Sequence, residues 1–286
     1  NNLKSEKVKL PFTKMSACSN DYIYINCFEN KVSSPEFLSI YLSDRHNGVG
    51  GDGVILICPS DKADAQMRMF NRDGSEGMMC GNGIRCVAKY LYDTGIAKKP
   101  VLRIDTKSGV KECSIMTMNG KAYRITVDMG AAELAPALVP VKLEGDSIVN
   151  KPVVIDGHEY YITCVSMGNP HCAVFTPSVD KLDLSAIGPK FENNPLFPER
   201  VNVEFIEVVD ERTLKVRVWE RGSGETMACG TGACAAVVAA TLNGRCTKGE
   251  DIRVILKGGD LTVRYTDETV FMTGAATTVF KGEIEI

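Results

Sequence analysis

Two cysteines, Cys80 and Cys229, each open a Cys-Gly-x-Gly turn at the start of a predicted helix. A cysteine at the positive end of a helix has a pKa below its free value of about 8.5, so its thiolate becomes accessible near neutral pH. Two such thiols on opposite faces of one carbon could remove a proton from one face and return a proton to the other. We therefore interpret the two cysteines as a matched acid–base pair.

The two turns lie inside a repeated segment. Residues 67–83 align without a gap with residues 216–232, at an offset of 149 positions, and seven of the 17 pairs are identical. Unrelated segments of average composition would share about one. Asn20 and Asn169 are separated by the same offset. The chain therefore consists of two related halves, each with one thiol at the same place.

The bulk composition excludes several classes of protein. The chain has 286 residues, a net charge of −3 and an ordinary hydrophobic fraction of 44%, which gives no reason to expect a nucleic-acid partner or an anionic membrane surface. No apolar stretch is long enough to span a bilayer, and no hydrophobic signal core lies near residue 1. Eleven cysteines are an odd count and the three histidines are scattered. We expect reduced thiols in the cytoplasm, no disulfide framework and no metal site.

The residue patterns predict many short strands and few helices. Helices are expected at 35–45, 82–94, 180–189 and 231–242. Strands are expected at 7–16, 22–27, 54–58, 66–71, 101–106, 110–117, 122–128, 153–156, 159–165, 171–176, 201–209, 212–220, 252–256, 260–265 and 269–273, followed by 277–286.

This order predicts an α+β protein with two strand-rich halves, each wrapped around one central helix. The region 131–140 is the best linker candidate because it carries two prolines and no periodicity. We place the N-terminal lobe at residues 1–130, joined by the segment 275–286, and the C-terminal lobe at 131–274.

The helix starts could also bind an anion. A Cys-Gly-x-Gly turn directs several backbone N–H groups outward at the positive end of the helix, where a carboxylate would dock. If the two halves face each other, an α-amino acid held by its carboxylate would have its α-carbon between the thiols. The helix ends would then stabilise the negative charge that develops on the carboxylate. This chemistry needs no pyridoxal phosphate, and we expect no cofactor.

Other polar residues near these turns are secondary candidates. His171 follows the turn Gly168-Asn169-Pro170, and Glu220-Arg221 precedes the loop that carries Cys229. By contrast, Cys86, Cys234 and Cys246 are interpreted as buried small hydrophobes. The sequence Gly230-x-Gly232-x-x-Ala235 looks like a dinucleotide fingerprint, but no series of parallel βαβ units surrounds it.

The longer motifs resemble those of the diaminopimelate epimerases. The motifs are Asn71-Arg72-Asp73-Gly74-Ser75-Glu76-Gly77-Met78-Met79-Cys80-Gly81-Asn82-Gly83-Ile84-Arg85-Cys86, Met167-Gly168-Asn169-Pro170-His171, Trp219-Glu220-Arg221-Gly222 and Ala228-Cys229-Gly230-Thr231-Gly232-Ala233. The resemblance implies a two-base epimerase that interconverts LL- and meso-diaminopimelate in lysine and peptidoglycan precursor biosynthesis, independent of pyridoxal phosphate. It also implies two pseudo-symmetric lobes, each a barrel-like sheet around a central helix, and a homodimer.

The resemblance assigns roles to individual positions. Cys80 and Cys229 would be the acid–base pair, His171 would tune a thiol or polarise the site, and Glu220 would meet the reacting ammonium group. The reacting carboxylate would be held by Gly81, Asn82, Gly230 and Thr231. The distal amino-acid head of the substrate would be bound by Asn20, Asn71, Asn169, Asn202 and Arg221.

The sequence departs from the family pattern at two places, and three alternatives remain. Ala17-Cys18-Ser19 stands where glycines are usual before Asn20, and Gly53 stands where glutamine is common. One alternative is another cofactor-independent racemase of the same fold, such as a proline racemase, although these typically carry histidine at the position of Asn82. A binding protein or isomerase that keeps the fold is the second, although such proteins generally lose a cysteine. The third is a redox protein with a Cys80–Cys229 disulfide.

Overall fold

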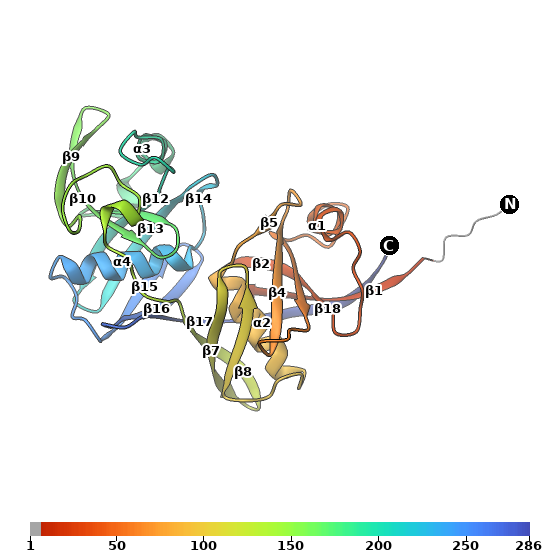
Figure 1. Cartoon of the computed structure of the whole chain (residues 1–286). Helices are drawn as coiled ribbons and strands as arrows, with labels where there is room; N and C mark the ends of the chain where they lie inside the picture. Colours follow the sequence, from red (N-terminus) through yellow and green to blue (C-terminus); the bar gives the residue numbers. More distant parts are fainter. Residues whose placement is uncertain (1–6) are drawn as a thin grey trace. The chain divides into compact units, whose positions relative to one another are not determined.

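The structure is a computed structural model that describes residues 7–286, and the chain forms two compact units (Figure 1). The first unit contains the described residues up to Ile125 together with Ala275–Ile286, and the second contains Thr126–Gly274. Strands β8 (Lys121–Asp128) and β17 (Val270–Ala275) carry the chain from one unit into the other. Both units are mixed sheets with few helices, which confirms the predicted α+β class.

The first unit contains most of the N-terminal strands and the strand at the C-terminus. Its further strands are β1 (Lys9–Ala17), β2 (Asn20–Asn26), β3 (Gly53–Cys58), β4 (Ala65–Asn71), β5 (Glu76–Gly77), β6 (Val101–Thr106), β7 (Gly109–Met118) and β18 (Thr277–Glu285). β18 pairs antiparallel with β1, so the last strand of the chain completes the sheet of the first unit.

The second unit is built from the strands between these segments. They are β9 (Lys151–Ile155), β10 (His158–Ser166), β11 (Pro170–Phe175), β12 (Asn202–Asp210), β13 (Thr213–Glu220), β14 (Gly224–Glu225), β15 (Asp251–Leu256) and β16 (Gly259–Tyr265).

The two units pair their strands in the same order. In the first unit β1–β2 is antiparallel, β2–β3 parallel, β3–β4 antiparallel, β4–β6 parallel and β6–β7 antiparallel. The series β10, β11, β12, β13, β15 and β16 alternates identically in the second unit. The register agrees as well, because Ile23 lies opposite Val54 and Cys172 lies opposite Val203, each 149 positions later. The sequence repeat is therefore a repeat of topology.

Each unit has one central helix. Helix α2 (Gly81–Asp93) packs against β1, β2, β6 and β7, and α4 (Gly230–Leu242) packs against β10–β13, β15 and β16 (Figure 1). α4 is lined by alanine, valine and cysteine, nearly all of them buried, as expected of a helix enclosed on all sides. α2 instead buries Arg85, whose guanidinium donates to the carbonyls of Gly81 and Ala275 and to Asn82 Oδ1.

The remaining helices are peripheral. α1 (Pro35–Ser43) begins with a proline, and α3 (Leu184–Glu192) begins after Asp183, whose side chain caps it. Two short 3₁₀ helices, η1 (Pro136–Leu138) and η2 (Val179–Lys181), complete the list for residues 7–286.

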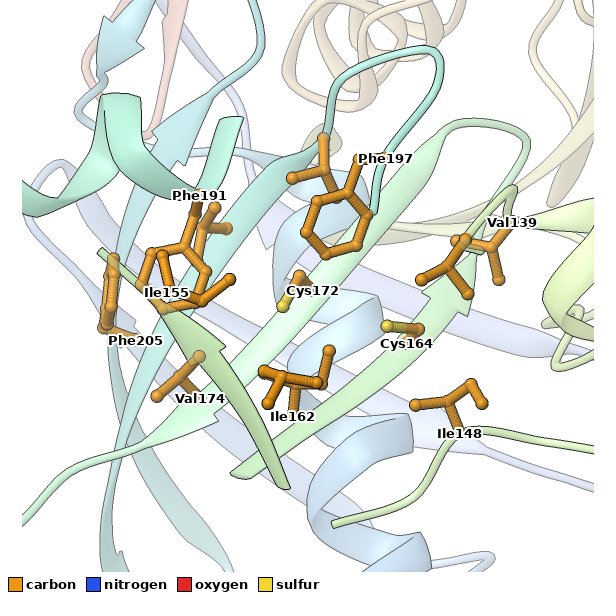
Figure 2. Packing of buried hydrophobic residues seen from close by; sticks show 14 of the residues in the cluster. Val139, Ile148, Ile155, Ile162, Cys164, Cys172, Val174, Phe191, Phe197 and Phe205 are labelled. Carbon is orange, nitrogen blue, oxygen red and sulfur yellow. The ribbon is translucent and has the colours of Figure 1, made fainter. Parts of the chain in front are cut away.

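A hydrophobic cluster in the second unit packs α3 and the chain near residue 140 against its sheet (Figure 2). Phe191 of α3 makes edge contacts with Tyr160 and Phe205, at ring-centroid distances of 4.9 and 5.7 Å. Val139 is 2% exposed in the same cluster. Burial of aromatic and branched side chains on this scale is the main source of stability for a sheet covered by a helix.

Two details differ from the sequence prediction. The helix expected at 180–189 begins at Leu184 and ends at Glu192, because Asp183 rather than an earlier residue supplies the cap and Pro189 is accommodated inside the helix. The region 131–140, expected as a linker, instead packs into the second unit through Val139 and through the bridge between Glu133 and Ser166. Over residues 7–286, the helices are too short or too polar to cross a membrane.

Candidate active site

The two cysteines occupy the same backbone position in their units. Cys80 and Cys229 are the N-cap residues of α2 and α4, with φ/ψ of −129°/120° and −127°/116°. Each Sγ accepts a hydrogen bond from the N–H of the residue three positions later, Gly83 or Gly232, at 3.3 Å. Both thiols therefore lie at the positive end of a 13-residue helix, where a thiolate is stabilised.

The second glycine of each turn allows the sheet to approach the helix closely. A Cβ at Gly83 would lie 2.7 Å from Ile55 Cδ1, and a Cβ at Gly232 would lie 2.9 Å from Glu204 Oε1. These separations are too short for a real Cβ, so an added side chain would force the buried Ile55 or Glu204 side chain to move. The Cys-Gly-x-Gly pattern thus fixes where each thiol stands.

Cys80 is half-buried among neutral groups. Its Sγ lies 3.2 Å from Asn20 Oδ1 and 4.0 Å from the Tyr22 hydroxyl. Asn20 is oriented by Asp52, whose Oδ2 accepts from Asn20 Nδ2 at 2.8 Å. Burial, and then the neighbouring Cys80, raise the pKa of Tyr22, so its hydroxyl stays protonated and can donate to the sulfur. The contacts of the Cys80 sulfur described here are therefore with a neutral amide and a neutral phenol.

Cys229 is buried among carboxylates. Its side chain hydrogen-bonds with Glu220, which is also held by the hydroxyl of Thr226. Burial raises the pKa of Cys229 well above its usual value, and Glu220 and Glu204 raise it further. The Thr231 hydroxyl lies 3.5 Å from Cys229 Sγ, and its hydrogen bond lowers the pKa of the thiol. In this arrangement Cys229 retains its proton at neutral pH.

A chain of hydrogen bonds leads from Cys229 into the interior of the second unit. Beyond the Thr231 hydroxyl, Asn169 Nδ2 donates to Thr231 Oγ1 at 3.2 Å, so Asn169 Oδ1 faces His171 Nε2 at 2.9 Å. His171 Nε2 therefore carries a hydrogen. The other ring nitrogen, Nδ1, lies 2.7 Å from Glu204 Oε1. The chain fixes the orientation of the amide and of the hydroxyl beside the thiol.

Glu204 and His171 form a hydrogen-bonded pair that is shielded from solvent. Both side chains are fully buried, and Glu204 Oε2 has no hydrogen-bond partner among the described residues. Burial raises the pKa of Glu204 to about 7, although the adjacent His171 lowers it. An ionised carboxylate with one bare oxygen is costly in the interior. With a pKa of about 7, Glu204 is partly protonated at neutral pH, which reduces the cost of burying its charge.

The polar residues expected to bind the distal head are distributed over both units. Asn202 is buried and fixed, since its Oδ1 accepts from the Arg221 backbone N–H at 2.8 Å and its Nδ2 donates to the Pro170 carbonyl at 2.9 Å. Arg221 is itself tied to the Glu199 carbonyl at 3.0 Å. In the first unit Asn71 donates to Ser75 Oγ at 3.1 Å.

Two further predicted residues flank the cysteines at the helix starts. Asn82 is buried, and its Oδ1 accepts from Arg85 at 2.9 Å. Its counterpart Thr231 contacts Cys229, as described above. Within the first unit, the structure thus brings Cys80, Gly81, Asn82 and Asn20 together. Within the second, it brings together Cys229, Gly230, Thr231, Asn169, His171 and Glu220.

The unusual segment before Asn20 adopts a left-handed conformation. Cys18 and Ser19 have φ of 49° and 62°, in the region that favours glycine. Gly168 stands at the position equivalent to Ser19 in the second unit, with φ of 92°. The backbone therefore keeps the conformation that a glycine would adopt more easily.

Sequence reasoning missed Tyr22 and Glu204. Tyr22 lies 149 positions before His171, so the repeat itself could have indicated it. Glu204 is a charged residue between the apolar Val203 and Phe205 in β12, and that break in the apolar run was its only signal. Across residues 7–286 no three histidine, cysteine, aspartate or glutamate side chains converge as metal ligands.

Comparison with known structures places the fold. A hydroxyproline epimerase from Agrobacterium vitis superposes with a TM-score of 0.68 at 15% identity, covering 97% of this chain and 93% of that chain. A phenazine biosynthesis protein from Bacillus anthracis superposes with a TM-score of 0.67 at 18% identity, covering 98% of this chain and 100% of that chain. At these identities the likeness concerns the fold alone.

Sequence comparison identifies the family. The family model described as diaminopimelate epimerase matches residues 12–135 and 163–279. A diaminopimelate epimerase from Desulfovibrio desulfuricans is 52% identical, covering 98% of this chain and 99% of the relative. The one from Acetivibrio thermocellus is 50% identical, covering 96% of this chain and 98% of the relative. The chain belongs to the diaminopimelate epimerase family.

Proposed function

We propose that this protein interconverts LL- and meso-diaminopimelate by a two-base mechanism in which Cys80 and Cys229 act on opposite faces of one α-carbon. The observation that carries the proposal is the pair of cysteine N-caps, equivalent in backbone and hydrogen bonding, in a chain of this family. Neither unit alone supplies two thiols in this position, so the mechanism requires both.

The reacting carboxylate binds at the starts of α2 and α4. N–H groups in the first turn of a helix have no intrahelical acceptor, and they are directed toward an anion at that end. Gly81 and Asn82 supply these groups in the first unit, and Gly230 and Thr231 supply them in the second. As the α-proton leaves, negative charge moves onto the carboxylate, and these dipoles stabilise it without reorganising.

Proton transfer then differs between the two faces. Cys229 holds its proton because of burial and its carboxylate neighbours, so it serves as the acid when Cys80 serves as the base. Removal of the α-proton by the Cys80 thiolate is accompanied by donation from the Cys229 thiol to the opposite face, which inverts the centre. The reverse reaction uses the same groups in exchanged roles.

Glu220 and the polar residues choose the substrate. The Glu220 carboxylate, next to Cys229, pairs with the α-ammonium group. The distal amino-acid head is bound by four side-chain amides and one guanidinium, those of Asn20, Asn71, Asn169, Asn202 and Arg221. Neutral amides with one guanidinium match a zwitterion better than a group of a single charge.

The reading as a proline racemase is the second candidate, because one structural neighbour is a hydroxyproline epimerase. A small cyclic substrate has no distal head for Arg221 and Asn202 to bind. Asn82, where proline racemases typically carry histidine, is occupied by its bond to Arg85. Both observations favour the longer substrate. The homodimer implied by the resemblance stays a prediction, and so does the cytoplasmic location expected from the cysteine count. We also predict that a Cys80–Cys229 disulfide would inactivate the enzyme.

The deciding experiment follows the α-proton by NMR. Reduced protein is incubated with LL-diaminopimelate in deuterated water with no added cofactor. Loss of the α-proton signal together with appearance of the meso isomer is the expected result. Exchange with proline but not with diaminopimelate would keep the two-thiol mechanism and discard the substrate. Absence of exchange with either would favour a binding protein.

A further inference from the structure

A second pair of cysteines lies on the face of the first sheet that is turned away from α2. Cys27 directly follows β2, and Cys58 ends β3. The two strands are parallel, with Asn26 opposite Ile57, and the Cys27 backbone N–H donates to the Ile57 carbonyl at 2.8 Å. Cys27 and Cys58 are therefore the next pair in register, and their side chains hydrogen-bond to each other.

These thiols are accessible. Both are half-buried, unlike Cys86 and Cys113, which are fully enclosed in the core. One side of the pair contacts the hydrophobic cluster of Ile25 and Leu56. The other side opens into a pocket of about 350 Å³. A reagent the size of a small peptide can therefore reach them.

The charges around the pocket distinguish the two sulfurs. Arg68 lines the pocket together with Glu29 and Lys31, and its guanidinium carbon lies 5.1 Å from the centre of the Phe70 ring. The same guanidinium pairs with Glu76 at 3.1 Å, so only part of its charge acts on the thiols. The hydrogen bond from Cys27, followed by the charge of Arg68, lowers the pKa of Cys58 against the effect of burial. The same hydrogen bond and burial raise the pKa of Cys27. In the site proposed below, Cys58 acts as the nucleophile and Cys27 as the neighbouring thiol.

We propose that Cys27 and Cys58 form a dithiol site, separate from the candidate active site, that reacts reversibly with low-molecular-weight disulfides. The Cys58 thiolate attacks one sulfur of the disulfide RSSR, which forms a mixed disulfide and releases RS⁻. Cys27 then loses its proton to the released thiolate and attacks Cys58 Sγ, expelling the second RS⁻, which takes a proton from water. The net reaction converts the dithiol and RSSR into the Cys27–Cys58 disulfide and two RSH.

This proposal does not depend on the proposed function, because it concerns a different face of one unit. A purely structural role would predict cysteines that are enclosed in the core, as Cys113 is, where burial raises the pKa to about 12. Cys27 and Cys58 instead lie in register beside an open pocket, hydrogen-bonded to each other and near the guanidinium of Arg68. Such surroundings make one thiol of a pair reactive.

Peptide mapping tests the proposal. Reduced protein is incubated with oxidised glutathione or with the uncharged hydroxyethyl disulfide, quenched in acid, alkylated and digested with trypsin. The expected product is peptide 15–31 linked to peptide 46–62, and fragmentation must place the bond on Cys27 rather than on Cys18. Dithiothreitol should release the two peptides. An unmodified peptide 46–62 after Cys80 has reacted would overturn the proposal.

Two serine variants test the order of events. Cys27→Ser should trap the mixed disulfide on Cys58, because the resolving thiol is missing. Cys58→Ser should leave Cys27 at least about tenfold slower to react than Cys58 in the first variant, since the thiolate is the reacting form. Equal rates in the two variants would contradict the assignment of Cys58 as nucleophile. The linked peptide in the unsubstituted protein decides the site even if a variant does not fold.

Discussion

The two units present their thiols on equivalent backbones but in different surroundings. At the offset of 149, Tyr22 stands where the second unit has His171, and Ile55 stands where it has Glu204. Both differences lie against the cysteine turns, since Ile55 contacts the first turn and Glu204 the second. The backbone repeat supplies two thiols in the same pose. Tyr22 and Ile55 are neutral side chains beside the first turn, whereas His171 and Glu204 are ionisable side chains beside the second.

This difference teaches how a symmetric scaffold supports two roles. In the proposed mechanism, one thiol holds a proton for one face of the α-carbon while the other, as a thiolate, takes the proton from the opposite face. Burial beside Glu220 and Glu204 keeps Cys229 protonated. In the proposed mechanism, a few side-chain differences on a shared fold would therefore distinguish the acid from the base.

The largest expected effect comes from removing either thiol. Cys80→Ala and Cys229→Ala should each lower kcat for epimerisation by at least about a thousandfold in both directions, because one face loses its proton carrier. The measurement is the NMR assay started from each isomer. Cys234→Ala, which removes a buried cysteine of α4, is the matched control and should keep its activity. Substantial turnover by either alanine variant would break the two-base mechanism.

Arg221 and its repeat counterpart Arg72 should respond very differently to the same substitution. Arg221→Lys should raise KM by about 10- to 100-fold, since a charge-assisted hydrogen bond contributes about 1.5–3 kcal/mol. Arg72→Lys is the control, because Arg72 is exposed. Steady-state kinetics of both variants give the comparison. An unchanged KM for Arg221→Lys would remove that residue from the binding site.

Glu204 should make the stability of the second unit depend on pH. Its pKa is raised from 4.5 to about 7, so the folded state holds a proton that the unfolded chain releases. The contribution of Glu204 to the free energy of unfolding is complete below pH 4.5 and is lost as the pH rises through 7. Relative to Glu204→Gln, the unsubstituted protein should lose about 2–3 kcal/mol across this range. Urea unfolding followed by Trp219, the single tryptophan, reports on this unit. If the free energy of unfolding depends on pH in the same way for both proteins, the prediction is wrong.

Alkylation compares the two thiols directly. At pH 7.5 iodoacetamide should label Cys80 at least about tenfold faster than Cys229, because the thiolate is the nucleophile and Cys229 is only 7% exposed and protonated. Glu220→Gln removes a charge beside Cys229 and should therefore reduce the ratio of the Cys80 labelling rate to the Cys229 labelling rate. Mass spectrometry of the labelled peptides gives both rates. Faster labelling of Cys229 would reverse the assigned roles.

The smallest effect concerns the turn before Asn20. Ser19→Gly should stabilise the first unit by about 0.5–1 kcal/mol, because its φ of 62° is one that glycine adopts without steric cost. The reciprocal change Gly168→Ser should destabilise the second unit. Amide hydrogen exchange measures the two changes in stability. It is followed in β1 and β2 for Ser19→Gly and in β10 and β11 for Gly168→Ser. Loss of stability in Ser19→Gly would show that the serine side chain matters more than the backbone.

Local patterns predicted most of the elements. The strand expected at 101–106 is β6 (Val101–Thr106), and the helix expected at 35–45 is α1 (Pro35–Ser43). α3 was placed too early because its start depends on the cap Asp183, which periodicity does not reveal. The short strands β5 and β14 have only two residues each and no pattern of their own.

The interior of the site was less predictable. The equivalent positions of Cys80 and Cys229 follow from the repeat, which is visible in one sequence. The contact between Glu204 and His171 joins residues 33 positions apart and depends on the parallel register of β11 and β12. Propensity and alternation do not determine that register, so the residue that hydrogen-bonds with the histidine was invisible until the strands were paired.

Each catalytic candidate is also the residue that begins a helix, and this double duty has an evolutionary consequence. Sulfur is a weak acceptor, and serine, threonine, aspartate and asparagine are the preferred residues at an N-cap. Selection for durability alone would therefore replace Cys80 and Cys229 with serine, so the cysteines persist as a compromise in favour of chemistry. Serine variants at these positions should therefore be folded but inactive, and they would be suited to trapping a complex with the unreacted amino acid.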